Sequence, residues 1–380
     1  MKTIFAILIV FGLIISHANA SDIAQIGKLP TVWDNKYGDE MYAYEKRATA
    51  FSPTENTLYI AGIYSSYDRN KKNIEGIWVW KINANGEKTA DLKVNEIQGE
   101  KLRDIGAMSS TEDGSTILAA TLLLSGRTIL VKLDAKGGIE FSKKLEEGVH
   151  IAKIIKTIDN KYLCIGYQKN DSLLMKIDAN GEVLWEKIND RGKDDMFIDG
   201  ILTEDGGFIL IENSGKSAQF FLASSEIWLT KYDSKGEKIT EKSFQGRHGS
   251  IARGKDGNYA IAYDKSGTAK QDIWIKSFDK DLNEKWNTNI TSTDFGLESF
   301  NVGSLTNGDY IVTGPIFLRP WVSYIDAAGA KKWDFHNKTM EPASGTDFIS
   351  KDNDCYIISS VVAITDQRIT NKVKVIKFQP

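Results

Sequence analysis

The stretch KIDANGEVLWEK, residues 176–187, decides the fold, because it indicates two strands joined by a tight turn. Apolar residues precede Asp178, the Asn180-Gly181 pair is typical of hairpin turns, and a second apolar run ends at Trp185. Nearly the same phrase recurs along the chain, at anchors separated by 51, 44, 55, 46 and 47 residues. Periods of this size are typical of propellers and solenoids. The anchors are Asn83, Asp134, Asp178, Asp233, Asp279 and Asp326.

A second phrase precedes each turn, and it predicts another strand. NGDYIVTG (307–314), DNKYLCIG (159–166) and DGNYAIAY (256–263) each place a polar turn before a short β-rich run. A further apolar run precedes each copy, so one repeat holds four short strands, which we name a to d. No segment shows sustained helical periodicity. The sequence therefore predicts an all-β fold, a seven-bladed β-propeller of four-stranded antiparallel blades.

The two ends of the chain are expected to close the ring. The seventh repeat lacks its strand d, and residues 23–34 contain a spare strand in which Trp33 matches Trp286. We therefore expect residues 23–34 to be the outer strand of the last blade, beside residues 372–379, which protects the sheet edges at the junction. Residues 21–380 would then be a single propeller domain. The tryptophans recur at two repeat positions, which predicts core packing rather than ligand stacking.

The repeats resemble those of bacterial secreted or periplasmic seven-bladed β-propellers, whose pattern is DGGYIVxG followed by W/LxKxDxxGxxxW. These proteins are distant relatives of the pyrroloquinoline-quinone-like and WD-type propellers. The resemblance covers essentially the whole mature chain and implies the fold, whereas the family includes scaffolds, binders and enzymes. In the quinone family, Gly and Trp each lie one residue farther from the Asp than Gly181 and Trp185 do here. The quinone-binding residues therefore cannot be transferred, and we expect no cofactor.

The first twenty residues indicate a secretory signal peptide. Met1-Lys2 precedes an apolar run (4–15), and Ala18-Asn19-Ala20 precedes the expected cleavage before Ser21. The apolar run is too short to span a bilayer comfortably, so we expect no membrane insertion. The sequence thus predicts a periplasmic or secreted monomer.

Charge and cysteine content exclude two further possibilities. The 48 basic and 51 acidic residues nearly balance, whereas a nucleic-acid partner usually requires a basic face. Cys164 is expected in strand b of the third blade, and Cys355 in the a–b turn of the seventh. Because those blades are not neighbours, we expect two free thiols rather than a disulfide.

The connections between strands are expected to sort onto two faces of the ring. The a–b and c–d turns are short and share one face, which we name the tight-turn face. The b–c and d–a connections share the other, which we name the long-loop face, and they include segments 65–76, 213–226 and 363–371. Variable loops on a rigid scaffold commonly carry function, so we expect the site at the channel mouth on the long-loop face.

Polar residues at the starts of the inner strands are the candidate binding residues. Histidines there could move protons, and carboxylates beside arginines could bind a sugar or act as acid and base. A solvated rim is the alternative. No residue set indicates a metal site, and no catalytic residue can be assigned. The candidates are Arg103, Asp104, His150, Asp195, Arg247, His248, Glu298 and Asp347, with Arg47 and Asp194 beside them, and Phe220 and Phe221 in segment 213–226.

Three functions remain open from the sequence. The first is a non-enzymatic exported propeller that binds a protein or glycan partner, or acts as a scaffold, through its long-loop face. The second is a glycan-directed hydrolase or lyase that uses the His, Asp, Glu and Arg residues of the rim. The third is a subunit of a periplasmic oxidoreductase.

Overall fold

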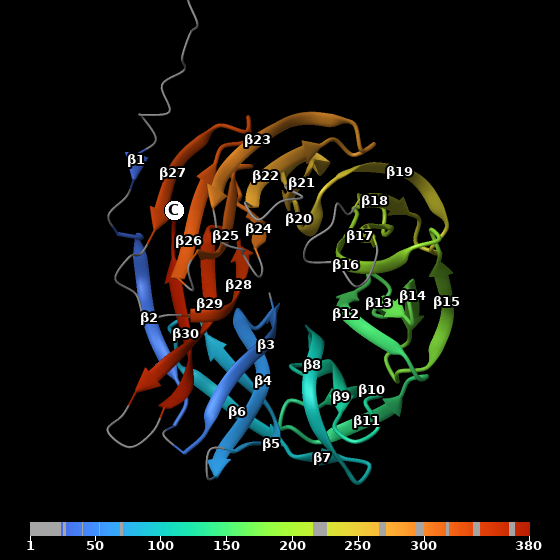
Figure 1. The fold of residues 1–380 in the computed structure, drawn as a ribbon, viewed down its shortest axis with the longest axis vertical. Helices are drawn as coiled ribbons and strands as arrows, with labels where there is room; N and C mark the ends of the chain where they lie inside the picture. Colours follow the sequence, from blue (N-terminus) through green and yellow to red (C-terminus); the bar gives the residue numbers. More distant parts are fainter. Residues whose placement is uncertain are drawn as a thin grey trace, which may run out of the picture.

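The chain folds into a ring of seven antiparallel sheets, as the computed structural model shows (Figure 1). The structure describes residues 24–380 except 26–27, 40, 53, 69–70, 216–225, 266–270, 294–299, 317–318, 337–342 and 365–368. A single 3-10 turn, η2 (Lys255–Gly257), is the helical element of these residues. The predicted all-β, seven-bladed propeller is therefore confirmed.

Blades 1 to 4 follow one another along the chain, and each begins with its inner strand. Blade 1 contains β3 (Ala43–Ser52), β4 (Thr57–Asp68), β5 (Lys71–Asn83) and β6 (Lys88–Val94). Blade 2 contains β8 (Glu100–Ser110), β9 (Thr116–Leu122), β10 (Thr128–Leu133) and β11 (Ile139–Lys144), and the short β7 (Glu96–Ile97) pairs with β8. Blade 3 contains β12 (Val149–Lys156), β13 (Tyr162–Gln168), β14 (Asp171–Ile177) and β15 (Val183–Asn189). Blade 4 contains β16 (Asp194–Leu202), β17 (Phe208–Gly215), β18 (Glu226–Tyr232) and β19 (Lys238–Gln245).

Blades 5 to 7 complete the ring, and the last one takes its outer strand from the start of the chain. Blade 5 contains β20 (Arg247–Arg253), β21 (Tyr259–Asp264), β22 (Gln271–Phe278) and β23 (Glu284–Thr293). Blade 6 contains β24 (Asn301–Ser304), β25 (Tyr310–Ile316), β26 (Arg319–Ile325) and β27 (Lys331–His336). Blade 7 contains β28 (Ala343–Lys351), β29 (Asp354–Ile364), β30 (Ile369–Phe378) and β2 (Thr31–Tyr37).

The N-terminal segment closes the ring, but its boundaries differ from the prediction. Strand β2 lies antiparallel beside β30, with Thr31 opposite Phe378, so the outer strand is 31–37 rather than 23–34 (Figure 1). The short β1 (Ala24–Gln25) pairs in parallel with β27 and adds a fifth strand to blade 6. The change of blade coincides with Pro30, which has no N–H to donate to a sheet. Buried Leu29 packs there against core residues of blades 6 and 7.

The recurring phrase is explained by a contact between neighbouring blades. In blade 3, Asp178 Oδ1 accepts the N–H groups of Asn180 and Glu182 at 2.9 and 2.8 Å, which fixes the c–d turn. Gly181 has φ 81°, and a Cβ atom there would lie 2.6 Å from the ring of Phe141 in blade 2. The aromatic residue of one outer strand thus covers the turn glycine of the next blade, in a space that a side chain would fill.

The tryptophans serve this core packing, as predicted. Trp33 and Trp286 also donate their indole N–H to the carbonyls of Ala84 and Ala327 in the next turn, at 2.9 and 3.1 Å. Trp78 and Trp321, on third strands, are fully buried. The apolar clusters join neighbouring sheets, so each blade is stabilised by the blades beside it.

Both cysteines are free and buried. Cys164 lies in β13, as predicted, whereas Cys355 lies in β29 rather than in the preceding turn. Burial raises the pKa of the Cys164 thiol to about 12, so this group is a weak nucleophile at neutral pH. None of the helical segments in the part of the chain that the structure describes could cross a membrane.

Candidate functional site

The two faces of the ring carry different connections, but some expected loops are strands. Segment 65–76, predicted as a long loop, extends the hairpin of β4 and β5, with Ser65 opposite Ile74. The described ends of segment 363–371 also pair with each other. Segment 213–226 lies mostly outside the described residues, and Phe220, Phe221 and Glu298 lie outside them too. The long-loop face is therefore built from strand hairpins as well as from loops.

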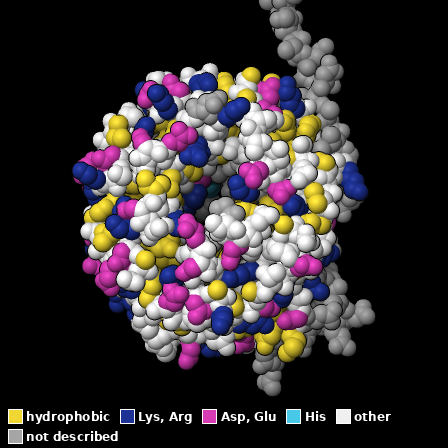
Figure 2. All heavy atoms as spheres, turned by 180° about the vertical axis from the view of Figure 1, so that it is seen from behind, with side chains coloured by type: hydrophobic (Ala, Val, Ile, Leu, Met, Phe, Trp, Pro, Cys, Tyr) yellow, Lys and Arg dark blue, Asp and Glu magenta, His cyan; other side chains and the backbone are white. Residues whose placement is uncertain are grey.

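A cavity of about 640 Å³ lies on the axis of the ring. Residues of all seven inner strands line it, and one face of the disc is hollowed at its centre, with charged side chains around the opening (Figure 2). Its volume is within the range of small-molecule pockets. Of the ten candidate residues, Asp347 lines this cavity, and so does the neighbouring candidate Arg47. The lining also includes Ser110 and Glu112, so the cavity extends toward the tight-turn face.

β-Bulges shape the wall of the cavity. Within the described residues, six of the seven inner strands have a shift of register near their midpoint, for example at Arg47 in β3 and Ala152 in β12. Bulges bend a strand and re-aim its side chains. The positions that follow these six shifts, together with Asn301 at the start of the described β24, form a ring, which we name the channel belt. It consists of Ala48, Ala107, Lys153, Asp199, Ser250, Asn301 and Asp347.

The charged groups of the channel belt are paired with neighbours. Lys153 forms an ion pair with Asp199, whose Oδ2 also accepts the N–H of Ile251 at 2.9 Å. Lys46 Nζ lies 3.4 Å from Asp347 Oδ2, and the Thr49 hydroxyl donates to the same carboxylate. Burial would raise the pKa of Asp347, but the Lys46 charge and these hydrogen bonds outweigh it, so its pKa lies below the ordinary value.

Two candidate histidines are packed into the blades. His150 stacks on Tyr167, with ring centroids 4.7 Å apart, and burial lowers the pKa of His150. Burial and the Arg247 charge also lower the pKa of His248, although Asp264 opposes them. His248 has φ 53°, an uncommon conformation for a residue with a side chain. Both imidazoles are therefore mainly neutral at pH 7.

Arg247, another candidate, is a buried structural residue. Its Nε donates to Asp264 Oδ2 at 2.7 Å, and their side chains are 7% and 0% exposed. Removing either partner would leave the other as an unpaired buried charge, so the pair holds β20 and β21 in their present arrangement.

Arg103 and Asp104 lie next to an exposed apolar turn on the long-loop face. Asp104 Oδ1 accepts a hydrogen bond from Arg47 Nε at 2.8 Å, which joins blades 1 and 2, and Arg103 is exposed. The turn between β9 and β10 presents Leu124, which is 85% exposed, and Leu123 at 39%. We name Arg103, Asp104, Leu123 and Leu124 the blade-2 patch.

Glu100 holds the turn of the blade-2 patch in place. Its Oε1 accepts the N–H groups of Leu124 and Ser125 at 2.8 and 2.6 Å, and it accepts the Ser125 hydroxyl at 3.0 Å. The N–H of Leu123 donates to the carbonyl of Lys101 at 2.8 Å. Leu124 is thus an apolar side chain on a turn whose backbone is fixed by its own blade.

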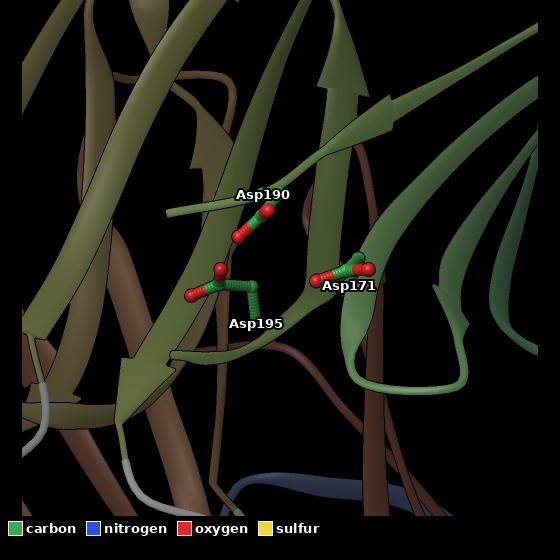
Figure 3. A group of neighbouring side chains, drawn as sticks. All are labelled: Asp171, Asp190 and Asp195. Carbon is green, nitrogen blue, oxygen red and sulfur yellow. The ribbon is translucent and has the colours of Figure 1, made fainter. Parts of the chain in front are cut away.

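Asp195 belongs to a group of three aspartates that the sequence did not reveal. Carboxylate oxygens of Asp171, Asp190 and Asp195 all lie within 4.8 Å of one another (Figure 3). Burial and the charges of Asp190, Asp195 and Asp194 raise the pKa of Asp171. Asp171 begins β14, Asp190 follows β15 and Asp195 lies in β16, so no short motif contains them. The one feature of the sequence that could have predicted this group is that all three aspartates lie at or beside b–c and d–a connections of blades 3 and 4.

No family model and no curated protein matches this chain. Its structure is similar to a catalytically inactive virginiamycin B lyase from Staphylococcus aureus, solved with quinupristin, at TM-score 0.57 and 10% identity over 91% of this chain and 99% of that one. It is also similar to the Dos1 propeller, at TM-score 0.56 and 11% identity over 92% and 95%. Puromycin hydrolase gives TM-score 0.54 and 13% identity over 84% of this chain and 51% of that one. At such identities these similarities show the propeller fold alone.

Proposed function

We propose that this chain is an exported binding propeller, related to bacterial secreted propellers, that holds a protein partner on its long-loop face beside the channel mouth. The observation that supports this most is the fixed, exposed Leu124 in the blade-2 patch. Burying a leucine side chain fully in an interface contributes about 1.5–3 kcal/mol. Because Glu100 already fixes the turn, little conformational entropy would be lost on binding.

The chemistry of the blade-2 patch favours a protein over a glycan as the partner. Two adjacent aliphatic side chains complement an apolar pocket, which proteins commonly present and sugars do not. The Arg47–Asp104 pair and the exposed Arg103 lie beside them and would form part of a polar rim. An apolar centre with a polar rim is the usual anatomy of a protein interface.

Export is part of the proposal and is supported by the sequence of residues 1–20 alone. These residues lie outside the described part of the chain. The proposed partner would therefore be a periplasmic or extracellular protein, and no nucleic acid or lipid bilayer is needed.

The experiment compares two exposed aliphatic residues on opposite faces. Leu124→Asp places a charge on the long-loop face, and Ile158→Asp places one on the tight-turn face, where Ile158 is 70% exposed. Each purified mature variant is immobilised and offered the proteins of the source organism's envelope. Proteins retained by the wild type are identified, and their affinities are then measured with purified partner.

The expected result is a specific partner that Leu124→Asp binds at least tenfold more weakly and Ile158→Asp binds normally. Melting temperatures of the three proteins show whether the fold is intact. Loss of binding in Ile158→Asp alone would transfer the site to the tight-turn face. Equal affinity of all three proteins would remove the blade-2 patch from the interface.

An enzymatic function is the second candidate, and His248 is the observation that favours it. A side chain held at φ 53° stores backbone strain, which clusters at functional sites, and the lowered pKa of His248 leaves a neutral base. His248→Asn tests this role, because asparagine tolerates the same backbone conformation. Hydrolase or lyase activity on cell-wall oligosaccharides that disappears in this variant would support the enzyme. Activity that His248→Asn retains would exclude His248 as the base.

A further inference from the structure

We propose that Asp171, Asp190 and Asp195 form a binding site for a divalent cation of the calcium class. The site lies on the long-loop face, where blade 3 meets blade 4, and it does not depend on the proposed partner. No metal site is predicted from the sequence, because the three acids come from separate elements. The fold brings them together (Figure 3).

The spacing of the carboxylates fits a large cation. One oxygen from each aspartate lies within 4.8 Å of the other two. Calcium binds oxygen at about 2.3–2.6 Å, so two of its ligand oxygens can be up to about 5 Å apart. Magnesium binds at about 2.0–2.1 Å, which limits that separation to about 4.2 Å. Because 4.8 Å is the upper limit of these separations, the trio fits the wider oxygen shell of calcium more readily than the narrower shell of magnesium.

Asp195 supplies an independent reason to expect a ligand. The residue is 2% exposed, and its Oδ1 has no hydrogen-bond partner among the described residues. The other oxygen accepts the N–H of Arg191 at 2.7 Å. A buried carboxylate oxygen without a partner is costly, and a bound cation would satisfy it. Figure 3 shows the side chains of Asp171 and Asp190 turned toward the Asp195 carboxylate.

Within the described residues, no basic side chain forms an ion pair with any of the three aspartates. The nearest arginine in sequence, Arg191, uses its side chain elsewhere, with Nε 2.5 Å from Glu212 and Nη2 3.0 Å from Glu241. The other buried acids of the inner strands and their neighbours, such as Asp264 and Asp199, do have basic partners. The Lys169 charge partly offsets the repulsion at Asp171, but the pKa of Asp171 is still raised, so the three carboxylates converge with more negative than positive charge around them.

The site is open on one side and tied to both blades. Asp190 is exposed and Asp171 is half-buried, so water can complete the coordination sphere of a calcium ion. The N–H of Asp195 donates to the carbonyl of Asn170 at 2.7 Å, which already joins the two blades at this point. A bound cation would link Asp171 of blade 3 and Asp195 of blade 4 through Asp190 of the connecting segment.

The test uses the mature protein after dialysis against EDTA. Calorimetric titrations with CaCl₂ and with MgCl₂ measure the dissociation constants. Melting curves with and without about 5 mM of each salt measure the stabilisation, since this concentration exceeds the Kd range on the order of 10⁻⁴–10⁻³ M of extracellular calcium modules. Asp190→Asn removes a ligand that is exposed and leaves the core unchanged. Glu147→Gln is the matched control, because Glu147 is an exposed acid in the preceding d–a connection of the same face.

The expected result is one calcium ion per chain, bound at least tenfold more tightly than magnesium, with a rise in melting temperature. Asp190→Asn should weaken calcium binding tenfold or more, and Glu147→Gln should behave as the wild type. Asp171→Asn should repeat the effect of Asp190→Asn. Absence of calcium binding by the wild type, or equal affinity in Asp190→Asn and the wild type, would overturn the proposal.

Discussion

The turn aspartates of the tight-turn face and the aspartate trio of the long-loop face lie in opposite surroundings. On the tight-turn face, turn N–H groups and hydroxyls surround the carboxylates and hold the pKa values of Asp113, Asp134 and Asp233 below their ordinary value. On the long-loop face, burial and neighbouring acids raise the pKa of Asp171. The tight-turn face repeats the same hydrogen-bonded turn in successive blades. The long-loop face keeps an unfavourable arrangement of charge at one junction, which costs stability there.

The a–b turns show how regular the tight-turn face is. Thr111, Thr157 and Thr203 each donate their hydroxyl to the aspartate two residues later. The backbone N–H of each threonine also donates to a carbonyl four residues ahead, at 2.9–3.0 Å. The same local sequence therefore produces the same turn in three successive blades.

The largest difference between the faces is expected from two glycine substitutions. Gly181→Ala and Gly99→Ala both place a side chain at positive φ, 81° and 74°, which costs about 1–2 kcal/mol. At Gly181 on the tight-turn face the new Cβ would also lie 2.6 Å from Phe141, whereas nothing lies within 4 Å at Gly99 on the long-loop face. Overpacking adds about 1–3 kcal/mol.

Urea unfolding should therefore give a loss of roughly 3 kcal/mol for Gly181→Ala and about 1 kcal/mol for Gly99→Ala. The same urea unfolding experiment with Phe141→Leu in the background of Gly181→Ala should show that part of the lost stability is recovered, because the Phe141 ring is the obstacle. Similar losses for the two glycine variants would show that the contact between blades is not tight, and the proposed contrast between the faces would be weakened.

Acid should act mainly through the tight-turn face. The Thr111 hydroxyl, followed by other hydrogen bonds and the Lys132 charge, outweighs burial and lowers the pKa of Asp113 from 3.8 to about 2. A carboxyl with a lowered folded-state pKa contributes stability above its unfolded pKa and loses it as the pH falls through the folded value. Stability should therefore decrease between about pH 4 and pH 2.

Urea midpoints at pH 6, 4 and 3 measure this loss, and Asp113→Asn is the comparison. The variant should be less stable than the wild type at pH 6, and the difference should shrink at pH 3. If the stability difference between the wild type and Asp113→Asn stays constant with pH, the contribution of Asp113 comes from its packing and hydrogen bonds rather than from its charge.

The smallest effect on stability is expected at Glu100, on the long-loop face. Glu100→Ala releases the turn that carries Leu124, because the four hydrogen bonds from Leu124 and Ser125 to its carboxylate are lost. The urea midpoint should hardly change, whereas affinity for the partner should fall severalfold through the freed turn. Glu100→Gln keeps an acceptor oxygen and should bind more like the wild type. Unchanged affinity in Glu100→Ala would show that the fixed turn is irrelevant to binding.

The fold could be predicted from the sequence because its signal is repeated. The Asp178–Gly181–Trp185 spacing encodes a turn, a left-handed position and a contact with the next blade, and each copy confirms the others. The boundary error at residues 23–34 has a physical cause, since Pro30 interrupts the strand and one segment serves two blades. Segment 65–76 is predicted as a loop because it is rich in polar residues, whereas its described residues pair as the two strands of a hairpin.

The candidate site was predictable only in outline. The face and several rim residues, such as Asp104 and Asp195, follow from the order of strands. The burial of Arg247 against Asp264 does not, because the partner comes from the neighbouring strand of the same blade. The convergence of Asp171 and Asp190 on Asp195 depends on how two blades meet. The sequence contains no pattern that predicts an exposed Leu124, because its exposure depends on the conformation of a single turn.

The pairing of Thr31 with Phe378 has a consequence for the order in which the molecule can be built. Strands β2 and β30 belong to one sheet, so blade 7 cannot form until β30 has been synthesised. Until then, the strand that will become β2 has no partner, and the growing chain exposes an open sheet edge. A chain truncated within β30 should therefore aggregate rather than form a six-bladed ring, and a chaperone that shields the N-terminal strand would raise the yield.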